Sequence, residues 1–314
     1  MDSRFASTLL SMVRSMVSLS NHRGNDKGPM DQIIKKASIL IEAIPYIQAF
    51  RRKIFVIKYG GSILDDPKIR HNVLQDIVFL SYVGIRIIIV HGGGPHISAR
   101  MKEEGLKNEF VDGIRVTDKK TLTIVGEELE KLNRQIVAEI KNLKGDVTGL
   151  RGQENIIFVK KKKAVKDLGF VGTITSVNKE HLEAHLSQGQ ITVVSPMGMT
   201  VEKQSHNVNA DEVASAIANS MKAEKLVLLT DVPGVMRDLK DISTLMSTLT
   251  LSQVDELIKS DVIVGGMIPK VNSCVEALKG GGVNKTHIVD ARMPHALLLE
   301  FFTDQGVGTQ IIKS

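Results

Sequence analysis

Short apolar runs alternate with longer amphipathic stretches along most of the chain. Six runs rich in β-branched residues predict strands, and eight stretches with helical spacing of apolar residues predict helices. The predicted strands are residues 54–58, 85–90, 156–159, 191–194, 226–229 and 287–289. The predicted helices are residues 68–83, 95–104, 119–142, 179–186, 211–222, 251–260, 269–278 and 294–302. This alternation predicts an α/β fold, a three-layer αβα sandwich with a mostly parallel central sheet.

An additional amphipathic stretch, residues 31–50, precedes the first predicted strand. Its apolar residues follow helical spacing, and Pro45 should kink the helix because it removes a backbone hydrogen bond. These apolar positions are Ile33, Ile34, Ala37, Leu40, Ile41 and Ile44. A helix outside the α/β pattern must pack either on its own body or on another subunit. Residues 1–29 are rich in serine and arginine and poor in acids, which fits a transit segment or an unfolded extension before a start at Met30.

Composition narrows the class of function. With 314 residues and 42% apolar content, the chain can bury a large core. The net charge of +6 invites a nucleic-acid interpretation. Aromatic residues, however, make up only 4% of the chain, too few for a base-stacking surface. The densest lysine run, 160–163, is typical of a solvated strand end. We therefore expect no nucleic-acid partner. No apolar stretch reaches transmembrane length, so we expect no membrane partner.

Cysteine and histidine usage excludes several chemistries. The single cysteine, Cys274, cannot form an internal disulfide, which suits a reducing, cytoplasmic location; a plastid remains open if residues 1–29 are a transit segment. The nine histidines show no metal-ligand spacing, so we expect no metal site built by the protein. Neither a P-loop nor a serine nucleophile elbow is present in the sequence.

A run of three glycines, Gly92, Gly93 and Gly94, lies between the strand predicted at 85–90 and the helix predicted from Pro95. Glycines at such a junction let the backbone approach an anion closely, and the free N–H groups of the helix start favour negative charge. A plain strand-to-helix turn rarely needs three glycines. The run therefore indicates an anion- or substrate-binding loop.

Two lysines occur beside glycine pairs. Lys58 ends the first predicted strand and is followed by Gly60 and Gly61, and Lys270 follows Gly265 and Gly266 at another predicted helix start. Each lysine could place a positive charge over a backbone that cradles phosphate oxygens, although a lysine at a strand end is also common without function. Together they suggest a clamp on one phosphoryl group.

Three other segments carry candidate binding groups. Asn207 and Asn209 alternate in an extended stretch and could grip a substrate, while Asp211 is either a functional acid or only a helix-capping one. The segment from Thr230 and Asp231 through Gly234 follows an apolar strand, and Asp231 could meet a metal or a ribose. Arg115 is the best candidate for a bidentate carboxylate clamp.

In this order the motifs resemble the amino acid kinase family, and within it the members that phosphorylate N-acetylglutamate. The matching segments are VIKYGGS (56–62), VHGGGP (90–95), DGIRVTD (112–118), NVNADEVA (207–214), LLTDVPGV (228–235) and GGMIPK (265–270). The resemblance implies an ATP- and Mg²⁺-dependent kinase that phosphorylates the γ-carboxylate of N-acetyl-L-glutamate in arginine biosynthesis. It implies catalytic roles for Lys58, Lys270 and Asp211. It implies acceptor binding by Gly93, Gly94, Arg115, Asn207 and Asn209. It implies ATP binding by Gly60, Gly61, Thr230, Asp231, Gly234, Val235, Gly265, Gly266 and Met267.

The resemblance also implies feedback control. The N-terminal helix is similar to one that interlaces dimers into a hexamer, a trimer of dimers, in arginine-inhibited members, and residues 287–309 resemble their inhibitor segment. His287, Glu300 and Gly308 are the matching positions for arginine. The implied organisation is an extension at 1–29, an interaction helix at 30–50, an acceptor lobe with dimer contacts at 51–222, and a nucleotide lobe with the arginine site at 223–314.

Departures from the family pattern leave the acceptor open. Residues 125–133, residues 149–152 and Thr173 differ from the usual family sequence. Two alternatives therefore stand: a related kinase acting on another carboxylate, such as glutamate or aminoadipate, or a catalytically idle amino-acid sensor.

Overall fold

The computed structural model describes residues 29–304 and 306–313. The chain divides into two compact units, residues 1–49 and residues 50–314. The predictions for residues 1–28 lie outside the described residues. Every strand and helix predicted between residues 54 and 302 is present, with each end within two residues of its predicted place. The strongly periodic segments were therefore assigned correctly.

The first unit contains α2 (Pro29–Glu42) and most of α3 (Ile44–Phe50), separated by a turn at Ala43. The predicted kinked helix is confirmed. Pro45 has no N–H to donate to the carbonyl of Ile41 one turn earlier, so the helix restarts instead of continuing. The apolar side chains of α2 are exposed, for example Ile33 at 58% and Ile41 at 65%.

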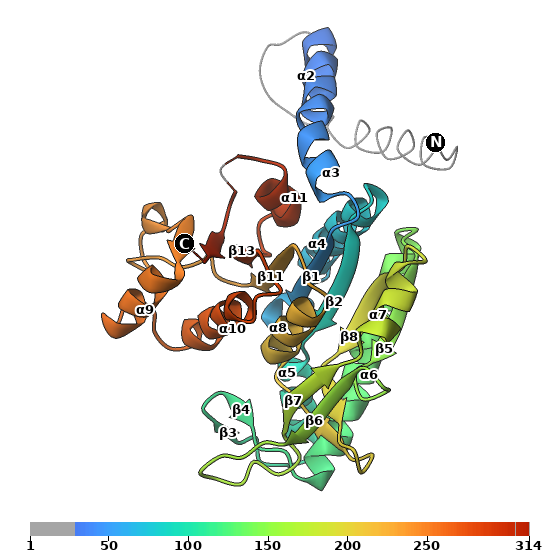
Figure 1. Ribbon diagram of the computed structural model, residues 1–314, viewed down its shortest axis with the longest axis vertical. Coiled ribbons are helices and arrows are strands. Elements are labelled where there is room, and N and C mark those ends of the chain that lie inside the picture. The colour runs from blue at the N-terminus through green and yellow to red at the C-terminus, as the bar shows by residue number, and fades with distance from the viewer. Residues whose placement is uncertain (1–28, 305, 314) are drawn as a thin grey trace. The chain divides into compact units, whose positions relative to one another are not determined.

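The second unit is built on an eight-stranded sheet (Figure 1). Its strands lie in the order β12 (Thr248–Thr250), β14 (Thr309–Ile312), β13 (Lys285–Asp290), β11 (Lys225–Thr230), β1 (Ile54–Tyr59), β2 (Arg86–His91), β8 (Ile191–Ser195) and β5 (Val147–Arg151). From β13 to β5 all neighbours are parallel, whereas β14 runs antiparallel to β13. The predicted mostly parallel sheet is confirmed.

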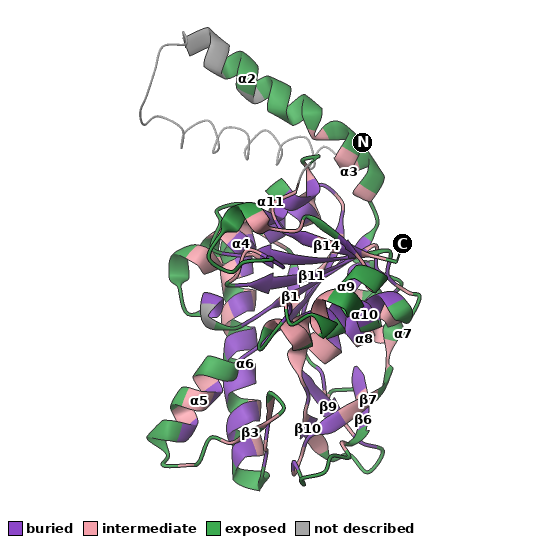
Figure 2. Ribbon diagram, turned by 90° about the vertical axis from the view of Figure 1, so that its left-hand side faces the viewer, coloured by how far each residue is buried: buried purple, intermediate pink, exposed green. Residues whose placement is uncertain are grey.

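Helices cover both faces of this sheet, which gives the three predicted layers (Figure 2). One face packs against α4 (Pro67–Tyr82), α6 (Lys119–Asn142) and α11 (Ala296–Phe301), and the other against α7 (Lys179–Leu186), α8 (Ala210–Ser220) and α10 (Met267–Lys279). The central strands β1, β2, β8 and β11 are almost wholly buried because both faces of a parallel sheet are covered. Helix α5 (Gly94–Glu103) packs on α6, and α9 (Leu251–Lys259) packs on α10.

A smaller sheet and a hairpin complete the second unit (Figure 1). The sheet contains β10 (Ser205–Asn207), β9 (Met197–Met199), β6 (Ile157–Lys161) and β7 (Gly172–Val177), and the hairpin pairs β3 (Phe110–Val111) with β4 (Ile114–Arg115). Lys160, Lys161 and Lys163 are exposed at the end of β6, as expected for a solvated strand end. Two short 3-10 turns, Ser62–Leu64 and Ile242–Thr244, lie in loops.

Cys274 is fully buried in α10, and burial raises the pKa of its thiol to about 12, so its predicted place in the core is confirmed. Within the described residues, no helix combines the length and the apolar character that a membrane span needs.

Acid should destabilise the fold through His91, the fully buried last residue of β2. Burial lowers the pKa of its imidazole to about 4, from the ordinary histidine value of 6.5. Between these values the unfolded chain binds a proton that the folded chain does not, so the free energy of unfolding falls as the pH falls. From pH 7.5 to pH 5 this group should remove roughly 2 kcal/mol. Urea titrations should show a larger loss for the wild type than for His91→Asn; equal losses would contradict the prediction.

Candidate active site

The candidate site lies at the carboxyl edge of the large sheet, where adjacent parallel strands β1 and β2 end. Each strand is followed by a glycine turn, and the two turns touch. A Cβ atom added to Gly60 would lie 3.0 Å from the backbone nitrogen of Gly92. The N–H of Gly92 donates to the carbonyl of Tyr59 across the same junction (2.7 Å). A side chain at this point of the rim would therefore require the two turns to shift.

The loop after β2 leads into the N-terminus of α5, as the sequence predicted. Gly94 and Pro95 form the first turn, and Gly93 is the N-cap without any side-chain cap. A Cβ atom on Gly93 would lie 2.8 Å from Leu129 Cδ2 of α6, so a larger residue would require the Leu129 side chain or the loop to move. Uncapped N–H groups at a helix start can bind an anion.

A half-buried ion pair joins β1 to the start of α8. Lys58 Nζ lies 3.0 Å from Asp211 Oδ1, and both side chains are about 13–14% exposed. The contact has the distance of an ion pair, but Oδ1 accepts no aligned hydrogen bond from the described residues. The cap of α8 is Asn209, whose Oδ1 accepts from the N–H groups of Asp211 (2.7 Å) and Glu212 (3.2 Å). Capping therefore does not require Asp211, which leaves its carboxylate beside the lysine.

Arg115, in β4, is buried and has no acidic partner among the described residues. Its guanidinium donates to the Gly94 carbonyl (3.2 Å), to Ser98 Oγ (2.9 Å) and to the side chain of Asn108, and it lies 4.7 Å from the ring centre of Phe110. Burial lowers the pKa of this group. A buried cation held only by neutral groups is costly unless an anion joins it. The arrangement suits a carboxylate ligand.

These groups surround one cavity of about 250 Å³. Lys58, Asp211, Arg115 and the glycine loop 92–94 line it, together with Asn207 and Asn209. The structure thus brings together, in one cavity, predicted residues that lie more than 150 positions apart in the sequence. Its volume lies below the ~300–1,000 Å³ of typical ligand pockets, which suits a small acceptor.

The two asparagines have different local roles. Asn207 ends β10, and its Nδ2 donates to Thr117 Oγ1 (3.1 Å), which ties the small sheet to the segment after Arg115. Asn209 is occupied as the cap of α8. Both side chains line the cavity. Strand β10 ends at Asn207, and Asn209 is the last extended residue before α8.

The segments predicted to bind nucleotide lie on the same rim. Thr230 ends β11, and the following loop is held by Thr309, whose Oγ1 accepts from the N–H of Val235 (2.9 Å). Gly234 adopts a φ of +146°, which L side chains rarely adopt, and its Cα faces Thr309. Because α10 packs beside β13 and leads directly into it, its first turn lies at the carboxyl edge as well.

Helix α10 begins without a side-chain cap, at Gly266, after Gly265 with a φ of +55°. Lys270 lies in its first turns, and its Nζ donates to the Gly266 carbonyl (3.2 Å). Among the described residues, no hydrogen bond or ion pair connects Lys270 with Lys58 or Asp211. The two lysines are therefore placed on one rim but are not in contact.

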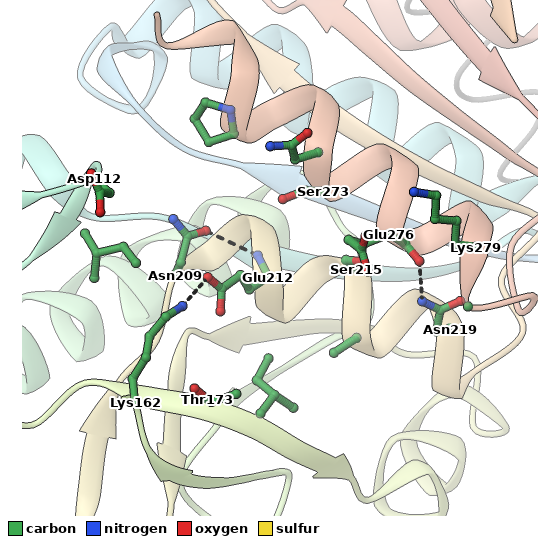
Figure 3. A pocket seen from close by; sticks show the side chains of 16 residues that line it. Asp112, Lys162, Thr173, Asn209, Glu212, Ser215, Asn219, Ser273, Glu276 and Lys279 are labelled. Carbon is green, nitrogen blue, oxygen red and sulfur yellow. Dashed lines mark hydrogen bonds and ion pairs between the residues drawn. The ribbon is translucent and has the colours of Figure 1, made fainter. Parts of the chain in front are cut away.

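A second, larger cavity of about 800 Å³ opens beside the first (Figure 3). It lies between α8 and α10 on one side and the β6–β7 hairpin on the other, where Lys162 reaches across to Glu212 (2.7 Å). The two cavities share Ile114 and Asn209 in their walls. Asn209 is its one predicted site residue, whereas Lys58 and the glycine loop 92–94 line the smaller cavity.

The residues predicted to hold arginine meet at the opposite edge of the sheet. His287 Nδ1 lies 2.6 Å from Glu300 Oε1, and Glu300 Oε2 accepts from the N–H groups of Val307 (2.7 Å) and Gly308 (3.0 Å). Burial lowers the pKa of His287 to about 4. Burial alone would raise the pKa of Glu300, but these hydrogen bonds outweigh it and the net shift is downward.

Sequence reasoning missed Lys225 in this cluster. Its Nζ lies 3.0 Å from His287 Nε2 and faces the rings of Phe50 and Phe301. Burial, and then the charge of Lys285, lowers the pKa of Lys225 to about 8. A lysine that opens an otherwise apolar strand is locally unusual, but its partner could not be identified from the sequence, because Val227, two residues on, pairs with His287 only in the folded sheet.

Comparison with known proteins places the chain in a family. The sequence model of the amino acid kinase family matches residues 53–290. The acetylglutamate kinases of Desulforamulus reducens and Methanocaldococcus jannaschii are 46% and 47% identical to it, over 89% and 90% of this chain and 98% of each relative. Among solved structures, N-acetylglutamate synthase from Neisseria gonorrhoeae, complexed with coenzyme A and N-acetylglutamate, superposes with a TM-score of 0.78 at 26% identity, covering 88% of this chain and 63% of that one. The chain belongs to the amino acid kinase family.

Proposed function

We propose that the chain transfers the γ-phosphoryl group of ATP to the γ-carboxylate of N-acetyl-L-glutamate, the second step of arginine biosynthesis. The observation that carries the proposal is the shared cavity of Lys58, Asp211, the glycine loop and the buried Arg115. The close relatives named acetylglutamate kinase, which the chain matches over nearly their whole length, support the same activity.

Arg115 would bind the α-carboxylate of the acceptor. Its planar guanidinium can form two parallel hydrogen bonds with a carboxylate, and such a ligand would supply the missing counter-charge. Asn207, fixed through Thr117, would add a polar contact from the opposite wall. The acceptor would then lie with its γ-carboxylate towards Lys58 and the N–H groups of Gly93 and Gly94.

The chemistry needs no general base. A γ-carboxylate has an ordinary pKa of about 4.3 and is already an anionic nucleophile at neutral pH. The barrier is the approach of two anions, which positive charge and backbone donors lower. Lys58 would stabilise the transferring group from the acceptor side and Lys270 from the nucleotide side. Asp211 would orient Lys58 through their 3.0 Å contact.

The rim fits ATP and Mg²⁺. The uncapped start of α10 offers backbone donors for phosphates, and the loop from Thr230 to Val235 follows β11 on the same rim. Within the described part of the chain, no group of three or more acidic, histidine or cysteine side chains could hold a metal ion. Mg²⁺ bound through ATP phosphates needs only one or two protein carboxylates. Bound in that way, it would offset phosphate charge during transfer.

We further propose that arginine inhibits the enzyme at the cluster of Lys225, His287 and Glu300. Glu300 can pair with a guanidinium, and the loop at Gly308 offers backbone groups beside it. Lys225 would attract the inhibitor's α-carboxylate. The exposed apolar face of α2 would join dimers into a hexamer, because such a face is stable in water only when another surface covers it. The regulatory site and the interaction helix would thus act together.

An ADP-release assay tests the activity directly. Release should require N-acetylglutamate, and glutamate or aminoadipate should support little turnover. Lys270→Ala serves as the control for contaminating kinases and should lower kcat by about 100-fold or more, since it removes charge stabilisation in the transition state. Turnover only with glutamate or aminoadipate would favour the related kinase. Absence of turnover with every acceptor would favour the sensor.

Replacing Arg115 by lysine should damage acceptor binding selectively. A single ammonium cannot reproduce the two-pronged contact, so we expect the KM for N-acetylglutamate to rise about tenfold or more. The KM for ATP should change less than twofold. Initial rates measured against each substrate separate the two effects. An equal rise in both KM values would contradict the assignment of Arg115 to the acceptor site.

Lys225→Met should weaken inhibition without harming catalysis. Loss of one charged hydrogen bond should raise the arginine concentration for half-inhibition about tenfold or more. Lys285→Met is the matched control, since Lys285 pairs with Lys225 in the sheet but is exposed. Light scattering on the wild type should give the mass of a hexamer. A wild-type dimer that ignores millimolar arginine would refute this regulation and leave the kinase proposal standing.

A further inference from the structure

Gly92 has its two backbone polar groups fixed from different sides. Its N–H donates to Tyr59, at the end of the neighbouring strand (2.7 Å). Its carbonyl lies 3.0 Å from Nδ1 of His91, whose ring is fully buried. A carbonyl can only accept, so Nδ1 carries the proton and donates. The carbonyl of Gly92 is thereby held towards the core.

The imidazole of His91 is itself held by Asn133 of α6. Asn133 Nδ2 lies 3.2 Å from His91 Nε2 and donates also to the carbonyl of Val193 in β8 (3.0 Å). Because burial keeps His91 neutral, Nε2 carries a lone pair that accepts one of these two N–H bonds. If the side-chain amide of Asn133 were turned over, its oxygen would face His91 Nε2 and the Val193 carbonyl, and neither of these can donate a hydrogen bond. Each polar atom in this chain of contacts therefore has one consistent role.

Packing leaves this network no other arrangement. A Cβ atom on Gly149 of β5 would overlap the side-chain oxygen of Asn133, so Asn133 occupies space that only glycine leaves open. Asn133 is 5% exposed and His91 is not exposed at all. A polar pair this deeply buried costs stability unless it is fully hydrogen-bonded, which makes its geometry well defined.

The geometry of the peptide unit carries this constraint to the cavity. In a planar trans peptide the C=O of one residue and the N–H of the next point in opposite directions. With the Gly92 carbonyl held in the core, the N–H of Gly93 must point away from it. Among the described residues, the N–H groups of Gly93 and Gly94 donate no backbone hydrogen bond, and both residues line the 250 Å³ cavity.

We propose that His91, held by Asn133, is a positioning residue that locks the 92–93 peptide so that the N–H of Gly93 faces the reacting anion. The role in catalysis rests on the proposed kinase function. His91 touches no substrate and exchanges no proton. It acts by preventing a flip of the peptide, after which a carbonyl oxygen would face the incoming negative charge.

The test compares two substitutions at His91. His91→Phe keeps the ring but removes the donor, whereas His91→Asn can place an amide N–H close to the position of Nδ1. We expect His91→Phe to lower kcat about tenfold to 100-fold, with a smaller change in the KM for N-acetylglutamate, because the lost donor matters most in the transition state. His91→Asn should recover to within about threefold of wild type. Folding is checked by thermal unfolding.

A measurement without turnover separates this proposal from the kinase assignment. In ¹⁵N-glycine-labelled protein, inorganic phosphate should shift the assigned Gly93 amide signal in wild type and in His91→Asn, and leave it in place in His91→Phe. Asn133→Leu gives a second route if His91→Phe does not fold, and should weaken the same response. A phosphate response that survives in every folded variant, or a His91→Asn enzyme as impaired as His91→Phe, would overturn the proposal. The protein could prove inactive on N-acetylglutamate while phosphate still shifts the Gly93 signal in wild type and His91→Asn but not in His91→Phe. That result would refute only the proposed function.

Discussion

The candidate site depends on a close backbone contact between two glycine turns. Strands β1 and β2 are parallel neighbours, so their turns reach the same edge of the sheet, and Gly60 and Gly92 meet there with 3.0 Å between an added Cβ and the opposing nitrogen. This approach lets Lys58 and the glycine loop share one cavity. Alanine at either position would bring its Cβ to 3.0–3.3 Å from the opposing backbone, so the two turns would have to shift by a few tenths of an ångström.

The long elements of the fold could be predicted because periodicity reports directly on burial. Helix α6 and strand β2 show unbroken patterns over their whole lengths, and both were found. Strands such as β10 (Ser205–Asn207) and β5 (Val147–Arg151) were missed because they are short or only partly buried and contain polar residues or glycine. Their pairing is decided by tertiary contacts, which a local pattern does not contain.

The prediction of site residues from the sequence was limited in a similar way. Lys58 and Arg115 could be selected because a charged residue beside glycines or at the end of an apolar run is locally unusual. His91 and Lys225 could not be assigned a role in this way, because their partners, Asn133 and His287, lie 42 and 62 positions away along the chain. For Asn209 the local pattern suggested more than its contacts show. Its residue type and spacing predicted substrate binding, whereas its side-chain oxygen caps α8.

Strand β11 connects the two edges of the molecule by a single extended segment. Lys225 stands at one end beside His287, and Thr230 stands at the other, where the loop predicted to bind nucleotide begins. Five residue steps separate them, or roughly 17 Å. The strand is buried and hydrogen-bonded to a neighbour on each side, so it can neither stretch nor slide alone. A displacement of β11 along its own axis would therefore have to involve its neighbouring strands as well.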